Sequence, residues 1–187
     1  MYSDIYAQGD LSASVIFGVI ESQTRNFQQF YNIDGVIGFA FPAGSSWGGT
    51  PPIDRLVQAG EIADVFSMCL QPNAGGVLTL GGADPNLYTG SFQYIPMLRY
   101  LGEYVLYVLD MTDVQISGTT IGLPAVDYTR YGTLGGCVLD SGTNTILFPV
   151  EIYSPWLVTF NNYWDCPSSS APPVCFSFFF LPYLLTH

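Results

Sequence analysis

The chain has 187 residues, of which 49% are hydrophobic and 10% charged, so it can bury a sizeable core and is not a disordered tail. Its formal net charge is -11 and it contains only 4 Lys and Arg residues, which excludes a basic surface for nucleic acid. The acidity fits either simple solubility or work in an acidic compartment, where protonation of carboxylates relieves self-repulsion.

The N-terminal part predicts short strands, since 20 Gly and 13 Pro favour strands joined by turns over long helices. Residues 11–20 predict a strand. An aromatic, turn-prone stretch follows at 27–33, and residues 34–39 predict a short apolar strand whose glycines suggest close backbone approach.

A short amphipathic helix is expected next. Thr50 is the expected cap, Pro51 or Pro52 suits the first helical turn, and Gly60 gives a stop signal.

The remainder of the chain predicts more strands and a second helix. Strands are expected at 65–71, 76–81, 91–96, 103–116 and 135–141, a turn at 117–118 and a helix within 148–164. The expected class is all-β with a few short helices.

The histidine and cysteine content restricts the possible chemistry. His187 is the only histidine, which removes most metal sites and the usual Ser-His and Cys-His pairs, so no metal or cofactor is expected. Titration chemistry then rests on carboxylates, Tyr or Cys. Cys166 and Cys175 are close enough in sequence for a local disulfide, the alternative being buried thiols at all four cysteines.

Neither end of the chain has a clear targeting signal. No basic region or apolar run follows Met1, so no signal peptide is predicted. Residues 174–185 are strongly apolar but short for a membrane span and contain Pro182, so a buried strand or an atypical chain end is favoured over an anchor.

One motif carries chemistry. Asp140 follows a predicted buried strand and is succeeded by Ser141, Gly142 and Thr143. The glycine permits a tight turn under the carboxylate, and hydroxyl and N–H groups at such a turn hold it ionised. The alternative is a purely structural Asx-turn at a strand end.

The order of six segments resembles the pepsin-like aspartic endopeptidase family. The segments are Asp34-Gly35-Val36-Ile37-Gly38, the helix from Pro51 to Gly60, Phe66-Ser67-Met68-Cys69-Leu70, the strand from Gly76 to Asp84, the loop Tyr88-Thr89-Gly90-Ser91 and the turn Asp140-Ser141-Gly142-Thr143. Together they are specific, whereas each alone is weak.

This resemblance implies a partial bilobed acid protease fold. Residues 1–92 would form the C-terminal part of the N-terminal lobe with the interlobe strands, and residues 93–187 a partial C-terminal lobe. The match fades beyond Phe148, and the tail 166–187 is atypical for the family.

The resemblance also implies peptide hydrolysis at acid pH by two aspartates that share a proton and activate water. Asp140 would be the second of them. The first aspartate turn and the flap are absent from the sequence, so this chain alone is expected to be inactive until the missing half of the N-terminal lobe is supplied. A homodimer pairing two Asp140 turns is disfavoured, because the apolar-apolar-Gly partner of that turn is missing.

Other expectations follow from the same resemblance. The substrate would be a polypeptide and the location the secretory pathway, either secreted or vacuolar and lysosomal. Substrate-pocket candidates are Phe27, Phe30 and Ile33 on one side and Tyr104 and Val138 on the other, with ordinary core packing as the alternative for each. Competing functions are a non-catalytic binding or inhibitor module that keeps the lobe fold and, more remotely, a carbohydrate-binding β-sandwich.

Overall fold

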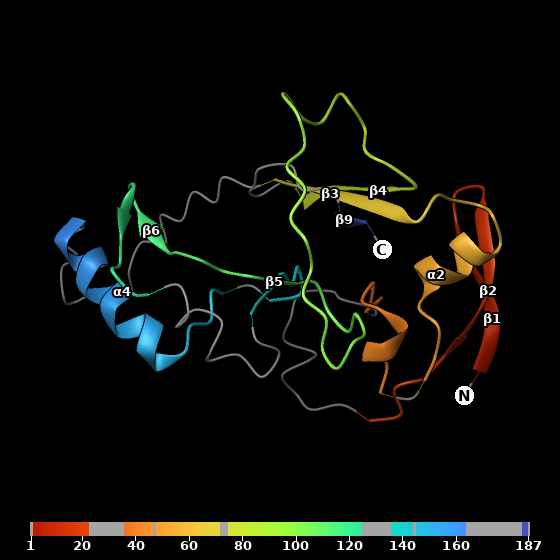
Figure 1. The fold of residues 1–187 in the computed structure, drawn as a ribbon. Coiled ribbons are helices and arrows are strands. Elements are labelled where there is room, and N and C mark those ends of the chain that lie inside the picture. Colours follow the sequence, from red (N-terminus) through yellow and green to blue (C-terminus); the bar gives the residue numbers. More distant parts are fainter. Residues whose placement is uncertain are drawn as a thin grey trace. The chain divides into compact units, whose positions relative to one another are not determined.

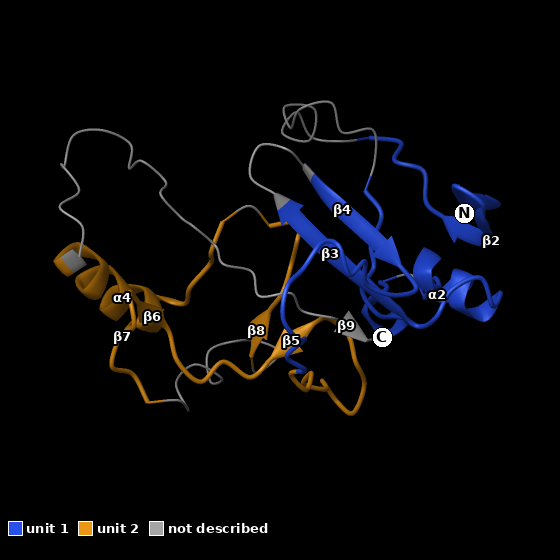
Figure 2. Ribbon diagram, turned by 90° about the horizontal axis from the view of Figure 1, so that it is seen from above, with its two compact units in different colours: residues 1–94, 180–187 blue, residues 95–179 orange. Residues whose placement is uncertain are grey.

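The computed structural model describes residues 2–22, 36–46, 48–71, 75–124, 136–143, 145–163 and 185–186. The chain divides into two compact units: unit 1 is Met1–Tyr94 with Phe180–His187, and unit 2 is Ile95–Phe179 (Figure 2). In the described part, strands outnumber the two short α-helices and the single 3-10 turn, η1 (Pro42–Gly44) (Figure 1). The expected all-β class with a few short helices is therefore confirmed.

Unit 1 begins with a β-hairpin. Strand β1 (Tyr2–Gln8) pairs antiparallel with β2 (Leu11–Phe17), from Tyr2↔Phe17 to Gln8↔Leu11. Gly9 has a φ of 61° at the turn, which a glycine adopts without steric cost. The strand expected at 11–20 is thus confirmed up to Phe17, whereas β1 was not predicted.

Helix α2 (Pro52–Gln58) packs against this hairpin, and Figure 1 shows it alongside β2. Ile53 and Leu56 on the helix are each 1% exposed, and Ala13 and Val15 are the buried residues of β2. Ile53 and Leu56 are three residues apart and so lie on one face of the helix, and Ala13 and Val15 are two residues apart and so lie on one face of the strand. The hairpin and the helix therefore bury one shared apolar layer.

The ends of α2 differ in how well they were predicted. Gly60 follows the helix with a φ of 75°, as the expected glycine stop requires. The expected cap at Thr50 is wrong: the N-cap is Pro51, and no side chain caps the helix. Pro52 begins the helix because the first-turn N–H groups need no intrahelical acceptor.

A three-stranded sheet completes unit 1. Strand β3 (Val65–Gln71) pairs antiparallel with β4 (Gly75–Leu80) on one side and with β9 (Leu185–Thr186) on the other. Phe66 of β3 is fully buried and meets Phe39 edge-on at 5.5 Å between ring centroids. The strands expected at 65–71 and 76–81 are confirmed.

Unit 2 contains two small strand pairs. Strand β5 (Val108–Leu109) pairs antiparallel with β8 (Cys137–Val138), and β6 (Gln115–Ile116) pairs with β7 (Thr119–Thr120). The expected turn at Ser117 and Gly118 joins β6 to β7, with φ angles of 50° and 81°.

Helix α4 (Val150–Tyr163) provides the core of unit 2 and confirms the helix expected within 148–164. Its Ile152 is 1% exposed and packs with Ile121. Partly buried apolar side chains surround this pair: Met111, Val114, Leu123, Phe148 and Trp156.

Two expected strands are wrong. Residues 91–96 form no strand, and Pro96 has no N–H to donate to a ladder. Within the stretch 103–116 the strands are β5 and β6, and residues 110–114 between them form no strand.

The cysteines are only partly described. Cys69 and Cys137 are free thiols. Cys166 and Cys175, the pair for which a disulfide was considered, lie outside the described residues.

Candidate active site around Asp140

Strand β8 leads directly into the candidate catalytic aspartate. Val138 pairs with Val108, and the Leu139 N–H donates to the Tyr107 carbonyl at 2.9 Å, which extends the ladder to the residue before Asp140. A Cβ at Gly136 would collide with the Leu109 carbonyl oxygen, so this close approach of the two segments requires glycine.

The turn after β8 binds both oxygens of the Asp140 carboxylate. The Gly142 N–H donates to Oδ1 at 2.9 Å, and the Thr143 hydroxyl donates to Oδ2 at 2.6 Å. The Thr143 N–H also donates to the Asp140 carbonyl at 3.2 Å, which closes the turn. A Cβ at Gly142 would lie 3.2 Å from Oδ1, tighter than most such contacts, so glycine suits this position.

These hydrogen bonds hold Asp140 in its charged form. The pKa of the Asp140 carboxyl is lowered, first by the Thr143 hydroxyl and second by the Gly142 N–H, while slight burial opposes them. The side chain is exposed, and so is that of Ser141. An accessible carboxylate that stays ionised in mild acid is in the protonation state that a general base requires.

The two predicted pocket residues in unit 2 lie in different settings. Val138 is 39% exposed on β8, two positions before the aspartate. Tyr104 is half-buried, and the Arg99 guanidinium lies 4.2 Å above its ring centroid. One face of Tyr104 is therefore covered by a cation, which leaves less of the ring for an apolar ligand.

Arg99 is the residue that the sequence reasoning missed. Its Nη1 also donates to the Gly102 carbonyl at 3.0 Å, so it braces the loop that carries Tyr104. The signal was present as Leu101-Gly102, a dipeptide whose glycine favours a tight turn and would bring Arg99 back onto Tyr104.

The candidates on the other side were Phe27, Phe30 and Ile33, and they lie outside the described residues, as does Asp34. The adjoining Val36, Ile37 and Gly38 are described, and they line a groove of about 660 Å³ within unit 1. Val36 is 77% and Ile37 56% exposed, so the apolar-apolar-Gly segment presents its side chains to this open groove.

Within the described ranges, no three His, Cys, Asp or Glu side chains gather as a metal-binding group. No helix in those ranges has the length and apolar character needed to cross a bilayer.

Sequence comparison with known proteins places the chain in a family. The sequence profile of "Eukaryotic aspartyl protease" matches residues 1–165. The chain is similar to pepsin A of Sus scrofa, with 31% identity over 155 residues that cover 80% of this chain and 37% of that protein. It is also similar to pepsin A of Callithrix jacchus (33% identity, covering 51% of this chain and 26% of that protein) and to chymosin of Camelus dromedarius (28%, covering 79% and 36%).

The matches thus span between about a quarter and little more than a third of the length of these relatives. The matched region includes the Asp140 turn, β8 and both strands of the β3–β4 hairpin. On the match of the family profile and the similarity to pepsins, the chain belongs to the eukaryotic aspartyl protease family and is pepsin-like.

Proposed function

We propose that this chain supplies one of the two catalytic aspartates of an acid endopeptidase, and that Asp140 is that residue. The observation that supports the proposal is the turn in which Asp140 sits, where a hydroxyl and a backbone N–H bind its two carboxylate oxygens and lower its pKa. A purely structural Asx-turn needs only one such bond, whereas a catalytic carboxylate benefits from being held in a fixed orientation.

The proposed reaction is hydrolysis of a peptide bond in a polypeptide substrate. Ionised Asp140 accepts a proton from water as the water oxygen attacks the scissile carbonyl carbon. A second, protonated carboxyl donates its proton to the carbonyl oxygen, and the resulting intermediate breaks down to a carboxylic acid and an amine. Two carboxylates about 3 Å apart cannot both ionise, so the pair works at acid pH.

The second carboxylate is proposed to come from polypeptide outside these 187 residues. The sequence contains one Asp-Ser-Gly triplet and no Asp-Thr-Gly triplet. A single aspartate cannot act as base and acid in the same step, so the isolated chain should not hydrolyse peptides. In this proposal, residues 1–92 form the C-terminal part of the N-terminal lobe with the interlobe strands. Residues 93–187 form a partial C-terminal lobe.

Two assays with a denatured protein substrate at acid pH test this proposal. The purified chain alone should give no cleavage. Cleavage by the isolated chain that disappears in Asp140→Asn would contradict the proposal that this chain is inactive by itself. A rate that rises with the square of chain concentration would instead indicate two Asp140 turns paired in a homodimer.

The second assay adds a polypeptide that carries an Asp-Thr-Gly half-site. Activity should appear, be abolished by Asp140→Asn and persist in the control Asp110→Asn, an exposed carboxylate of the same unit. Activity that survives Asp140→Asn would refute the role of Asp140.

A non-catalytic binding or inhibitor-like module is the second candidate, and the single aspartate triplet favours it. A statine-type inhibitor, which mimics the tetrahedral intermediate, separates the two. The complemented enzyme should bind it with loss of affinity in Asp140→Asn, whereas a binding module should ignore it.

The family relationship also supports a place in the secretory pathway, where a disulfide between Cys166 and Cys175 would be stable. Peptide mapping of the secreted protein without reduction should recover these two cysteines in one linked fragment. Recovery of both as free thiols would count against that compartment.

A further inference from the structure

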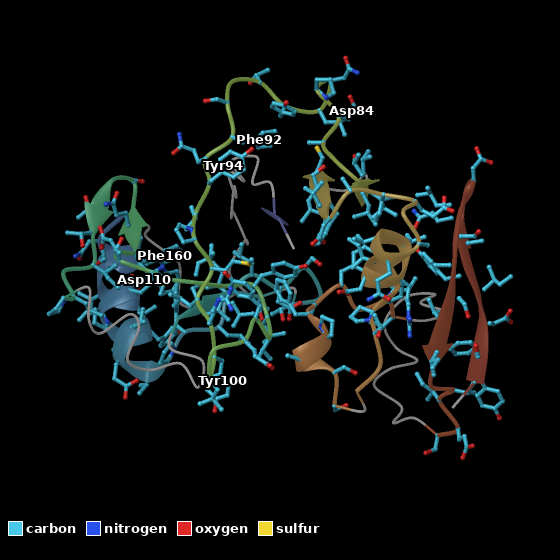
Figure 3. All side chains as sticks on the ribbon, turned by 45° about the vertical axis from the view of Figure 1, so that its right-hand side comes forward. Asp84, Phe92, Tyr94, Tyr100, Asp110 and Phe160 are labelled. Carbon is cyan, nitrogen blue, oxygen red and sulfur yellow. The ribbon has the colours of Figure 1, made fainter. Side chains whose placement is uncertain are left out.

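The loop after β4 contains the Asp84–Pro85 peptide bond, the one Asp-Pro bond in the sequence. The Leu87 N–H donates to the Asp84 carbonyl oxygen at 3.0 Å and closes a turn around this bond. Figure 3 shows Asp84 and Phe92 on the two arms of the loop. Asp84 is half-buried and Pro85 is exposed, so solvent reaches the bond.

The Asp84 side chain is held beside the peptide bond that follows it. Its Oδ1 accepts two hydrogen bonds from Asn86, at 2.9 Å from the backbone N–H and at 2.8 Å from Nδ2. Because Asn86 lies two residues further along the chain, these bonds close a ring across the Asp84–Pro85 bond. No donor among the described residues binds Oδ2, which leaves that oxygen available as a nucleophile. A carboxylate fixed close to a carbonyl carbon reacts with a high effective concentration.

The carbonyl group and the nitrogen of this bond both favour cleavage. The Leu87 N–H polarises the Asp84 carbonyl and stabilises negative charge that develops on its oxygen. Pro85 contributes a tertiary amide nitrogen without a hydrogen, so no backbone hydrogen bond of this nitrogen has to break. Its additional alkyl substituent makes this nitrogen more basic than an ordinary amide nitrogen, and therefore a better leaving group in acid.

The Asp84 carboxylate is the one charged group in contact with this turn in the described part of the chain. From β3, the Cys69 thiol lies 4.0 Å from the Leu87 carbonyl oxygen, and a thiol is uncharged in acid. The Tyr88 ring packs on Phe92 at 4.4 Å between centroids, and its phenol is uncharged in acid too. No ion pair joins Asp84 to another described residue. The pH dependence of cleavage should therefore come from the carboxylate and the leaving nitrogen.

We infer that the Asp84–Pro85 bond is a self-cleavage site that acid activates. Oδ2 attacks the Asp84 carbonyl carbon to form a cyclic anhydride. The C–N bond breaks, and its electron pair stays on the Pro85 nitrogen, which takes up a proton from the acidic solvent. Water then opens the anhydride, so the products are residues 1–84 with a new terminal carboxyl group and residues 85–187 with a new terminal amine.

The cut would break the covalent connection between most of unit 1 and the unit that carries Asp140. Unit 1 runs from Met1 to Tyr94 and unit 2 begins at Ile95, so residues 1–84 would no longer be joined to unit 2 through the chain. The inference does not depend on the proposed function, because the reacting groups are all in the loop after β4.

Intact-mass spectrometry of the purified chain, incubated in mildly acidic and in neutral buffer, tests this inference. Fragments 1–84 and 85–187 should appear in acid with a first-order rate constant that is independent of chain concentration and of a statine-type inhibitor. Cleavage should be slower at neutral pH. The same chain unfolded in urea at the same acidic pH is the reference, and the folded chain should cleave about tenfold faster or more, because unfolding releases the carboxylate from Asn86.

Two variants identify the reacting groups. Asp84→Glu keeps the charge but moves the carboxylate by one methylene, and it should slow cleavage by about tenfold or more. Asn86→Ala removes the Nδ2 donor but keeps the backbone N–H, so it should slow cleavage to a smaller extent. The matched control Asp110→Glu, at an exposed aspartate of unit 2, should cleave like the wild type.

A chain that stays intact in acid would overturn the inference. Equal rates for the folded and the urea-unfolded chain would overturn it too, because the folded turn would then contribute nothing. Cleavage of Asp84→Glu at the wild-type rate, or a rate that rises with chain concentration, would show that another agent cuts the bond.

Discussion

The chemistry of Asp140 depends on two short hydrogen bonds from its own turn. Of these, the bond from the Thr143 hydroxyl to Oδ2 is the larger cause of the lowered pKa. Since this bond forms with the ionised carboxylate, the stability that it contributes is present above the ordinary pKa of 3.8 and is lost as pH falls through the lowered folded value.

Thr143→Val should therefore raise the pKa of Asp140 toward its ordinary value. Valine keeps the branched shape but has no hydroxyl, while the Gly142 N–H still donates to Oδ1. A carboxyl-carbon NMR titration of Asp140 measures the change. Thr145→Val is the control, because Thr145 is an exposed threonine of the same loop. An unchanged Asp140 titration in Thr143→Val would contradict the assigned cause.

The glycine at the start of β8 is a second residue on which the site depends. Gly136→Ala would force a Cβ into the Leu109 carbonyl oxygen and toward side chains of Leu98 and Val108. Separation of the two segments should then lower the free energy of unfolding by about 1–3 kcal/mol, as overpacking does.

Gly82→Ala is the matched control for this prediction, since a Cβ there meets nothing within 4 Å. It should change stability by less than about 0.5 kcal/mol. Urea unfolding of the two variants measures the difference, and a Gly136→Ala variant as stable as Gly82→Ala would show that the segments separate without penalty.

Elements with a strong local pattern could be predicted from the sequence. Helix α2 has proline at its start, apolar residues at helical spacing and glycine after its end, and its boundaries were nearly right. Strands β3 and β4 are runs rich in apolar residues on either side of the turn-prone sequence Pro72-Asn73-Ala74-Gly75, and both strands were also predicted.

Elements that depend on distant partners could not be predicted from the sequence. Strand β1, Tyr-Ser-Asp-Ile-Tyr-Ala-Gln, is almost wholly exposed and has little apolar pattern of its own; its pairing with β2 defines it. The stretch 103–116 has strand-like composition throughout, yet the partner segments available to it are only two residues long at β5 and β6.

The candidate site likewise has a part that could be predicted from local sequence and a part that could not. The Asp140 turn was predicted because its chemistry lies within four consecutive residues. Arg99 was missed because its contact with Tyr104 requires the chain to reverse at Leu101 and Gly102. The predicted pocket roles of Tyr104 and Val138 remain predictions, since ordinary packing also accounts for both positions.

Helix α4 provides the test at the scale of the element. Its Ile152 is the most buried residue of the small core it shares with Ile121. Ile152→Ala should lower the free energy of unfolding by about 2–5 kcal/mol through lost burial and a cavity. Val158→Ala, on the same helix at a side chain that is 65% exposed, should have little effect.

Trp156 packs against this core. In a background where Trp47 and Trp164 are replaced by Phe, its fluorescence in a urea titration reports the unfolding of α4 directly. Equal midpoints for the two variants would show that the helix does not depend on this core.

At the scale of the whole molecule, charge is the dominant property. A net charge of -11 with 4 basic residues means that carboxylates mostly repel one another at neutral pH. Protonation relieves this repulsion as pH falls, which favours the compact state. The Asp140 turn acts in the opposite direction, but only below the ordinary carboxyl pKa of 3.8, because its folded pKa is lowered.

The melting temperature should therefore rise as pH is lowered from 7 to about 4.5 at low ionic strength and fall again in stronger acid, below the ordinary Asp pKa of 3.8. Salt provides the control, since at about 1 M the Debye length is near 3 Å and the repulsion is screened. High salt at pH 7 should raise the melting temperature toward its value at the optimum and flatten the pH profile between 7 and 4.5. A melting temperature that falls steadily from pH 7 downward, with or without salt, would show that specific carboxylate contacts outweigh the self-repulsion of the chain.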